Sequence, residues 1–318
     1  MTNAAPDATP DSTLTQARQS IAVGSKSFAL ASRFLPAGLH DDCVMLYAWC
    51  RHADDLIDGQ AAGFAADAPA DAPHDSAARL AELRDRTHRA LRGQPSAPVY
   101  AGLARVVAAR AIPHRHVDEL LDGFAMDVDG RVYRTLGDTL DYGYHVAGVV
   151  GVMMARIMGV RDEATLDRAS DLGLAFQLTN IARDVIDDAR IGRSYLPRDL
   201  LAAQGIDRID PDDPGQRAGL HRVALRLLDE AEIYYRSADA GIAALPRRPA
   251  LAIAAARNIY RQIGVKLRRI GPAAWDGRLS TTRGEKLRLA GRAMGATILN
   301  PRRRVPVVDR AGLYRRPV

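Results

Sequence analysis

The sequence predicts an all-α protein. Apolar residues recur at three- and four-residue spacing along most of the 318 residues, which is the spacing of one face of a helix. No segment shows the sustained alternation of apolar and polar residues that is typical of a half-buried strand. Because 47% of the residues are hydrophobic and no break is long enough to require a domain boundary, we expect one all-α domain with a substantial core.

Each expected helix corresponds to one run of apolar residues at helical spacing. In chain order the nine runs are 39–58, 76–92, 98–111, 114–130, 138–159, 162–192, 217–244, 247–270 and 280–297. The breaks between them carry turn residues: 63–75 is rich in Ala, Asp and Pro, 192–200 contains Gly and Pro, 210–215 reads DPDDPG, and 245–249 reads LPRRP. The positions of the turn residues therefore agree with the helix boundaries that the apolar spacing predicts.

Positive charge is concentrated at one end of the sequence. The formal net charge is +6, and six arginines occur among the last seventeen residues. We expect a disordered stretch at 1–12, the helical domain at 13–300 and a solvated basic tail at 301–318, which could also meet anionic lipid. The remaining basic residues form no patch interleaved with aromatic residues, which argues against a nucleic-acid binder.

The sequence indicates a cytoplasmic protein. Cys43 and Cys50 are the two cysteines, and their spacing matches neither a zinc site nor a redox motif. The first residues carry no signal-peptide pattern, and the longest apolar stretch, 146–155, is too short to span a bilayer.

An unusual group of acids lies in the stretch YAWCRHADDLID. On a helix, Tyr47, Arg51, Asp54, Asp55 and Asp58 share one face, while apolar residues cover most of the rest. A single D-x-x-x-D pattern is usually no more than a solvated helix face.

The same arrangement recurs in the stretch AFQLTNIARDVIDDAR. Gln177, Asn180, Asp184 and Asp188 form one stripe, with Arg183 beside it. Two such helices facing each other would line a cavity with carboxylate and amide oxygens, the ligands that Mg²⁺ prefers. Carboxylates packed this closely need cations, and neighbouring arginines match phosphate groups, so we expect a metal site that holds a diphosphate.

These two stretches resemble the squalene/phytoene synthase family. The family patterns Y-x-x-x-R-x-x-D-x-x-x-D and Q-x-x-N-x-x-R-D-x-x-x-D occur at 47–58 and 177–188. Five further segments resemble the family in the same order: GSKSFALAS (24–32), DGFAMDV (122–128), YGYHVAGVVG (142–151), GRSYLP (192–197) and IYRQIGVK (259–266). The resemblance implies a single-domain class I isoprenoid synthase bundle with a central cavity.

The resemblance also implies a reaction and a set of site residues. Two geranylgeranyl diphosphates would condense head to head, through prephytoene diphosphate, to phytoene, the first committed step of carotenoid synthesis. The metal, Mg²⁺ with Mn²⁺ as an alternative, would be held by Asp54, Asp58, Asn180, Asp184 and Asp188. Substrate would be bound by Ser25, Lys26, Ser27, Tyr47, Arg51, Gln177, Arg183, Tyr260 and Arg278. Tyr142 and Tyr195 would line the reaction cavity and act in catalysis together with the four aspartates.

Several alternatives stay open at this point. The enzyme could instead be a C30 synthase that uses farnesyl diphosphate, or the helices could form a non-catalytic module that binds metal or a partner. No nicotinamide cofactor is expected, although the missing glycine-rich fingerprint is weak support. Small residues in 146–155 could make room for a prenyl tail or allow close helix packing. His52 and His145 are expected to be structural. An insoluble product suggests peripheral contact with the inner membrane, and contact with other enzymes of carotenoid synthesis is also allowed.

Overall fold

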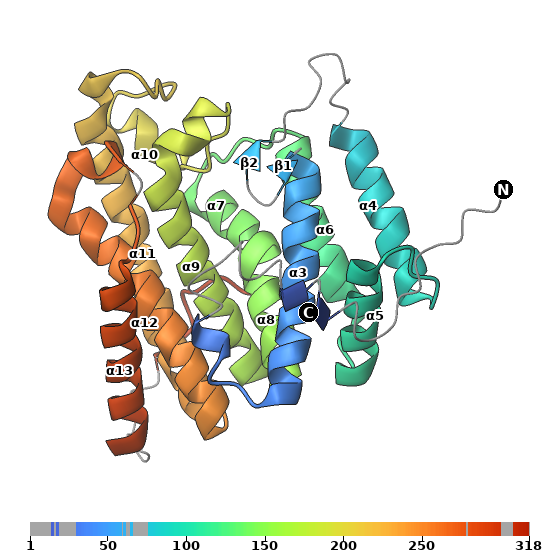
Figure 1. Cartoon of the computed structure of the whole chain (residues 1–318). Helices are drawn as coiled ribbons and strands as arrows, with labels where there is room; N and C mark the ends of the chain where they lie inside the picture. The colour runs from blue at the N-terminus through green and yellow to red at the C-terminus, as the bar shows by residue number, and fades with distance from the viewer. Residues whose placement is uncertain are drawn as a thin grey trace.

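The helices follow the periodic segments of the sequence to within a few residues. The computed structural model describes residues 14–15, 17–18, 30–58, 60–61, 64–65, 76–277, 279–299 and 308–317. Its long helices lie side by side as a bundle (Figure 1). They are α3 (Ala37–Asp58), α4 (Ser76–Leu91), α5 (Pro98–Arg110), α6 (His114–Val128), α7 (Leu136–Gly143), α8 (Val149–Ile157), α9 (Glu163–Arg190), α11 (Arg217–Ala244), α12 (Arg247–Ile270) and α13 (Arg283–Leu299).

Smaller elements occur where no regular structure was expected. They are the paired two-residue strands β1 (Gln60–Ala61) and β2 (Phe64–Ala65), the short helix α10 (Arg198–Ala202), and the 3₁₀ turns η2 (Pro214–Gln216) and η3 (Gly271–Trp275). The expected helix at 138–159 is interrupted by the π-helical segment η1 (Tyr144–Gly148). Such single-turn widenings of a helix often occur at functional sites.

Local chemistry fixes both ends of α9, the helix that carries the second acidic motif. The Asp162 side chain accepts a hydrogen bond from the backbone N–H of Thr165 (2.9 Å) and so caps the first turn. After the last turn, Gly192 has a φ of +76°, which is unfavourable for residues with a Cβ. The chain can therefore leave α9 sharply and return as α10.

Helix α9 is the centre of the bundle. It packs most extensively against α11 and also contacts α7, η1, α8 and α12, while α3 packs against α4, α5 and α8. The largest fully buried side chains include Trp49, Tyr100, Tyr144 and Tyr234, which come from four different helical elements. The two acidic motifs thus lie on α3 and α9, on helices fixed by packing on several sides.

Glycine allows the η1–α8 segment to approach α9 very closely. A Cβ on Gly173 would lie 2.3 Å from the carbonyl oxygen of Ala147, and one on Gly151 would lie 2.4 Å from that of Ala169. These distances are too short for any real side chain. Gly151 and Ala147 also line the central cavity, so small residues here serve both of the purposes considered for them.

The prediction of a solvated basic tail is wrong for residues 308–317. This segment, dark red in Figure 1, packs against the first half of α9. The Arg316 residue is only 6% exposed, and the side chains of Arg310 and Arg316 form ion pairs with acids of α9. Local composition suggested a soluble tail because the acids that bind these arginines lie far away in the sequence. The calls on 1–12 and 301–307 lie outside the described residues.

Within the described part of the chain, no helix has the length and hydrophobicity needed to cross a membrane.

The close approach of η1 and α9 predicts that a glycine-to-alanine substitution will destabilise the protein at this contact but not at an open position. We expect Gly173→Ala to destabilise the protein by about 1–3 kcal/mol, because the new methyl group meets backbone atoms that cannot move independently. Gly291→Ala on α13 is the matched control, since nothing lies within 4 Å of its Cβ position, and it should stabilise by about 0.5–1 kcal/mol. Thermal and urea unfolding would measure both; equal effects of the two substitutions would contradict this packing.

Candidate active site

A cavity of about 430 Å³ lies between the two acidic helices. One end is polar and includes Arg51, Asp54, Asp127 and Asn180, whereas most other lining residues are apolar or small. This shape and polarity suit a long hydrocarbon chain that carries a charged head group. Seven residues expected from the sequence line the cavity: Tyr47, Arg51, Asp54, Tyr142, Gln177, Asn180 and Tyr260.

Other expected residues lie beside the cavity or outside the described structure. Tyr195 contacts cavity residues and Asp58 lies close to Asp54, as described below, whereas Arg183, Asp184 and Asp188 follow Asn180 on α9 and are not among the lining residues. The calls on Ser25, Lys26, Ser27 and Arg278 fall on residues that the structure does not describe.

On α3, each acid of the motif has an arginine beside it. Arg51 donates to Asp54 (3.1 Å) and pairs with Asp55 (2.7 Å), while Arg193 donates to Asp58 (2.7 Å). Burial, followed by the charge of Asp58, raises the pKa of Asp54 to about 6. The Asp54 carboxylate is therefore held in an environment that opposes its charge.

On α9 the second motif shows the same electrostatic conflict. Arg183 binds Asp184 with its Nε at 2.6 Å. Burial, together with the charge of Asp184, raises the pKa of Asp188 to about 8. Both motifs also lie in the last turns of their helices, where the helix dipole disfavours negative charge. A bound cation would relieve all of these penalties.

The donor set fits a divalent cation. The Oδ1 atom of Asn180 is buried in the cavity wall without a hydrogen-bond partner, which is costly unless a ligand contacts it. Carboxylate and amide oxygens are the usual ligands of hard divalent cations. Among the described residues, however, no three His, Cys, Asp or Glu side chains lie close enough together to hold an ion by themselves. Additional ligands would have to come from water or from substrate.

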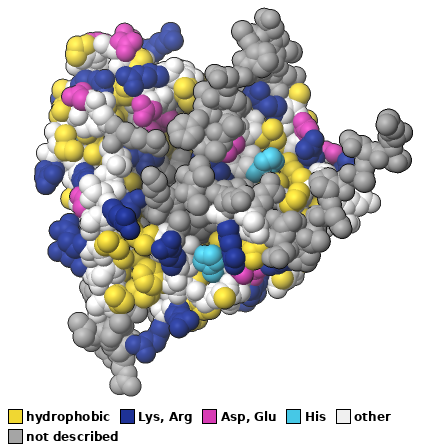
Figure 2. All heavy atoms as spheres, in the orientation of Figure 1, with side chains coloured by type: hydrophobic (Ala, Val, Ile, Leu, Met, Phe, Trp, Pro, Cys, Tyr) yellow, Lys and Arg dark blue, Asp and Glu magenta, His cyan; other side chains and the backbone are white. Residues whose placement is uncertain are grey.

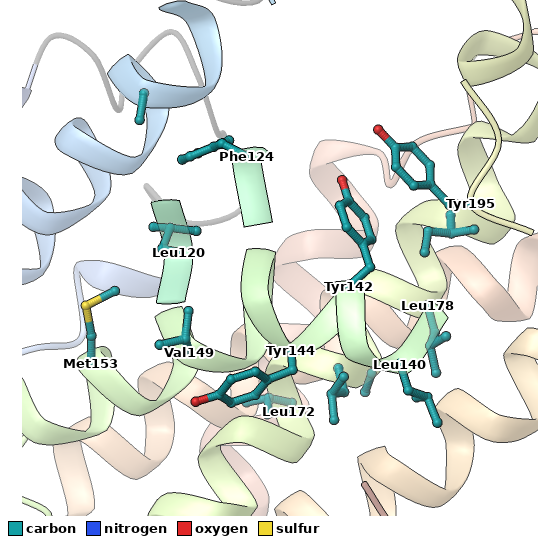
Figure 3. Close-up of a cluster of buried hydrophobic side chains, with 14 of the residues drawn as sticks. Leu120, Phe124, Leu140, Tyr142, Tyr144, Val149, Met153, Leu172, Leu178 and Tyr195 are labelled. Atoms are coloured by element: carbon teal, nitrogen blue, oxygen red, sulfur yellow. The ribbon is translucent and has the colours of Figure 1, made fainter. Parts of the chain in front are cut away.

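A second cluster joins α6, α7 and the loop after α9. Asp127 accepts hydrogen bonds from Tyr142 (3.1 Å) and Tyr195 (2.9 Å), whose rings stack at 4.6 Å. Figure 3 shows the two hydroxyl groups pointing in the same direction, whereas Tyr144 points elsewhere. Burial raises the pKa of both tyrosines, so both remain neutral donors.

Asp127 and Arg193 were missed as site residues in the sequence analysis. Asp127 occurs within the segment DGFAMDV, where a single acid surrounded by apolar residues was the available signal. Arg193 is separated from its partner Asp58 by 135 residues, and no local pattern indicates that contact.

The two histidines expected to be structural, His52 and His145, make contacts away from the cavity. His52 lies 3.2 Å from the hydroxyl of Tyr100, and Nδ1 of His145 lies 2.8 Å from the carbonyl oxygen of Asp141. Burial lowers the pKa of His52, which favours its neutral form. Neither ring is among the residues that line the cavity.

Comparison with known proteins agrees with this geometry. The sequence model described as Squalene/phytoene synthase matches residues 21–285. The chain belongs to the squalene/phytoene synthase family. The expected all-α isoprenoid synthase fold is confirmed by a solved dehydrosqualene synthase in complex with a ligand, which has 26% identity and a TM-score of 0.78 and covers 91% of this chain and 98% of its own.

Two bacterial members of the family are much more similar in sequence. The 15-cis-phytoene synthase of Paracoccus sp. (strain N81106 / MBIC 01143) is 53% identical over 300 residues, which cover 94% of this chain and 96% of that protein. The 15-cis-phytoene synthase of Enterobacter agglomerans is 51% identical over 297 residues, which cover 93% and 99%. This chain therefore aligns with nearly the full length of both relatives.

The raised pKa of Asp188 on α9 predicts how folding stability depends on pH without metal. Between about pH 4 and pH 8 the unfolded chain has lost the Asp188 proton while the folded protein keeps it, so folding stability should fall as pH rises. Asp188→Asn removes this titration, and the variant should gain melting temperature relative to the parent as pH rises from 5 to 8. Melting curves in chelator would measure the difference.

The matched control for this measurement is Asp187→Asn, whose side chain is 66% exposed on the same helix turn. Its melting temperature should follow that of the parent at each pH. If the Asp188→Asn and parent curves also stayed parallel, Asp188 would not be titrating in the assumed range.

Proposed function

We propose that this family member is a phytoene synthase. It condenses two geranylgeranyl diphosphates through prephytoene diphosphate to phytoene, the first committed step of carotenoid synthesis. The observation that carries the proposal is the 53% identity, over 94% of the chain, to a protein named 15-cis-phytoene synthase. The cavity supports it, because a diphosphate would meet the polar end and a prenyl tail the apolar remainder.

The acidic residues have a direct role in this proposal. Family members generally depend on divalent metal, and Mg²⁺, with Mn²⁺ as an alternative, would be bound by Asp54, Asp58, Asn180, Asp184 and Asp188. The bound metal supplies neutralisation of the diphosphate, which makes it a better leaving group. Arg51 and Arg183 lie beside the acids and would hold the phosphate oxygens.

The rest of the cavity would protect the reacting carbon atoms. Loss of diphosphate leaves an allylic cation, which water would destroy, and the apolar walls exclude water. The hydroxyls of Tyr142 and Tyr195 are fixed by Asp127, so their oxygen atoms would face the developing charge without ionising. Phytoene forms by loss of a proton rather than by reduction, so no nicotinamide is required.

Two other functions are less well supported. A C30 synthase is represented by less similar proteins: the dehydrosqualene synthase is 26% identical to this chain, and a protein named presqualene diphosphate synthase is 33% identical over 73% of it. A non-catalytic module that binds metal or a partner does not explain an apolar cavity next to the acids. Contact with other enzymes of carotenoid synthesis stays a proposal without a structural feature to support it.

A product assay tests the proposed reaction. Purified protein with Mg²⁺ and geranylgeranyl diphosphate, without nicotinamide, should release a C40 hydrocarbon into hexane. Asp54→Asn and Asp184→Asn should each lower turnover by about 10²–10³-fold, because each removes charge stabilisation at the leaving group. Both variants should remain folded, and Asp187→Asn should keep its activity because its side chain is exposed. A C30 product made only from farnesyl diphosphate would change the substrate assignment, and no hydrocarbon from either substrate would refute the proposed activity.

We also propose that the enzyme contacts anionic lipid from the cytoplasmic side through α12 and α13. Four of the six large hydrophobic residues exposed in the described structure are Val265, Ile270, Leu287 and Met294 on these helices. Figure 2 shows basic side chains among hydrophobic ones on the lower left, where these helices lie. Exposed apolar residues beside arginines suit an anionic membrane surface.

Vesicle flotation tests this contact. The protein should float with vesicles that contain anionic lipid and remain below neutral ones, because each arginine near the surface adds about 1 kcal/mol of attraction. Changing Arg288 and Arg292 to Gln should weaken flotation. As a matched control, changing Arg84 and Arg86 of α4 to Gln should not. Protein that stays below the vesicles in every case would contradict the proposal.

A further inference from the structure

The segment 308–317 neutralises a buried carboxylate of α9. Arg310 binds both oxygen atoms of Asp171, with Nε at 2.8 Å from one and Nη2 at 2.9 Å from the other. Asp171 is completely buried, so its charge would be costly without this cation. The segment is therefore part of the folded domain and not an appendage.

Further contacts fix the segment along the surface of α9 and α7. Arg316 donates to Asp167 (2.6 Å) and pairs with Glu163, one and two helix turns before Asp171. The Tyr314 hydroxyl donates to Asp141 of α7 (2.8 Å), and its backbone N–H donates to the hydroxyl of Tyr234 (3.0 Å). The position of the segment is thus determined by charged and polar contacts over its whole length.

The same segment holds a residue of the cavity wall. Arg168 lines the cavity, and its guanidinium donates to the carbonyl oxygen of Val308 (3.1 Å) and to the Oγ of Ser237 on α11 (2.9 Å). Ser237 in turn donates to Asp171. A Cβ on Gly241 would lie 2.7 Å from the Cβ of Arg168, so the base of this side chain is packed directly on α11. The Arg168 side chain is consequently fixed at its guanidinium group by hydrogen bonds and at its Cβ atom by packing against α11.

Arg168 lies far from the polar end of the cavity. It precedes Asn180 by twelve residues on α9, which corresponds to about 18 Å along the helix axis. An extended five-carbon prenyl unit has four main-chain bonds of about 1.5 Å and so advances by roughly 5 Å. Measured from the level of Asn180, four units span about 20 Å and reach the level of Arg168, whereas three units span about 15 Å and stop about 3 Å short of it.

We propose that Arg168 narrows the cavity at the depth of a twenty-carbon chain, and that the segment 308–317 holds Arg168 in that position. Arg168 is then a specificity-determining residue, and Arg310 is a positioning residue that acts through Asp171, Ser237 and Val308. The proposal rests on the proposed function, because it concerns the length of the prenyl tail that the same cavity accepts.

The test compares substrates of three lengths. The kcat/KM values for the C15, C20 and C25 prenyl diphosphates would be measured for the full chain and for Arg168→Ala. Shortening the side chain removes the narrowing, so the C25 to C20 ratio should rise by at least about tenfold, which is the discrimination that small changes in pocket size give. A loss that is equal for all three substrates would mean that Arg168 supports only the fold, and would overturn the proposal.

The role of the 308–317 segment needs its own variants. Arg310→Ala alone would leave Asp171 buried without a partner and could unfold the protein, so Arg310→Met is combined with Asp171→Asn to remove both charges. This double variant should shift the C25 to C20 ratio in the same direction as Arg168→Ala. The control Arg84→Ala, which removes a surface ion pair with Asp122, should leave the ratio unchanged. An unchanged ratio in the double variant would overturn the positioning role.

Calorimetric binding of non-reactive thio-diphosphate analogues of the three lengths separates this proposal from the proposed function. If the unaltered protein makes no hydrocarbon from any substrate yet binds the C20 analogue most tightly, and Arg168→Ala shifts that preference to C25, the depth assignment holds and only the reaction is wrong. If the unaltered protein makes phytoene but Arg168→Ala leaves both the binding order and the kcat/KM ratios unchanged, the depth assignment is wrong.

Discussion

The structure depends on keeping like charges close together on two partly buried helix ends beside a cavity. Asp54 and Asp188 lie in the last turns of α3 and α9, where burial, the charge of a neighbouring aspartate and the helix dipole all oppose ionisation of their side chains. The fold compensates with arginines beside each acidic motif, and it fixes both helices by packing on several sides. A site of this kind gains free energy when cations and a diphosphate bind, because they neutralise carboxylates that repel one another.

The apolar part of the cavity requires a long open space inside a closely packed bundle. Glycine contacts between η1, α8 and α9 allow this space, because they bring the helix backbones together without bulky side chains. Where Gly173 and Gly151 allow backbones to touch, the helices are fixed without bulky side chains, and the volume remains for a ligand. Rigid walls then suit a reaction whose cationic intermediates must be kept away from water.

Much of this could be predicted from the sequence, for reasons that also explain the failures. The helices that carry Asp54 and Asp184 were predicted nearly to the residue because helical periodicity is a local property. The π-helical segment from Tyr144 to Gly148 was missed because packing against α9, rather than local propensity, stabilises it. The roles of Asp127 and Arg193 were missed because their partners lie on other elements. The basic tail was misjudged because composition indicates charge but not the distant acids that bind it.

The ion pair between Arg310 and Asp171 has a consequence for the order of folding. The two residues are 139 positions apart in the chain, so their contact closes a very large loop. Contacts of this range carry a high entropic cost and form late, after the local helices. Until then the α9–α11 interface contains a carboxylate without its cation, so a nearly complete bundle would remain loosely packed around Ser237. The cavity wall at Arg168 is therefore completed only when residues far apart in the sequence have come together.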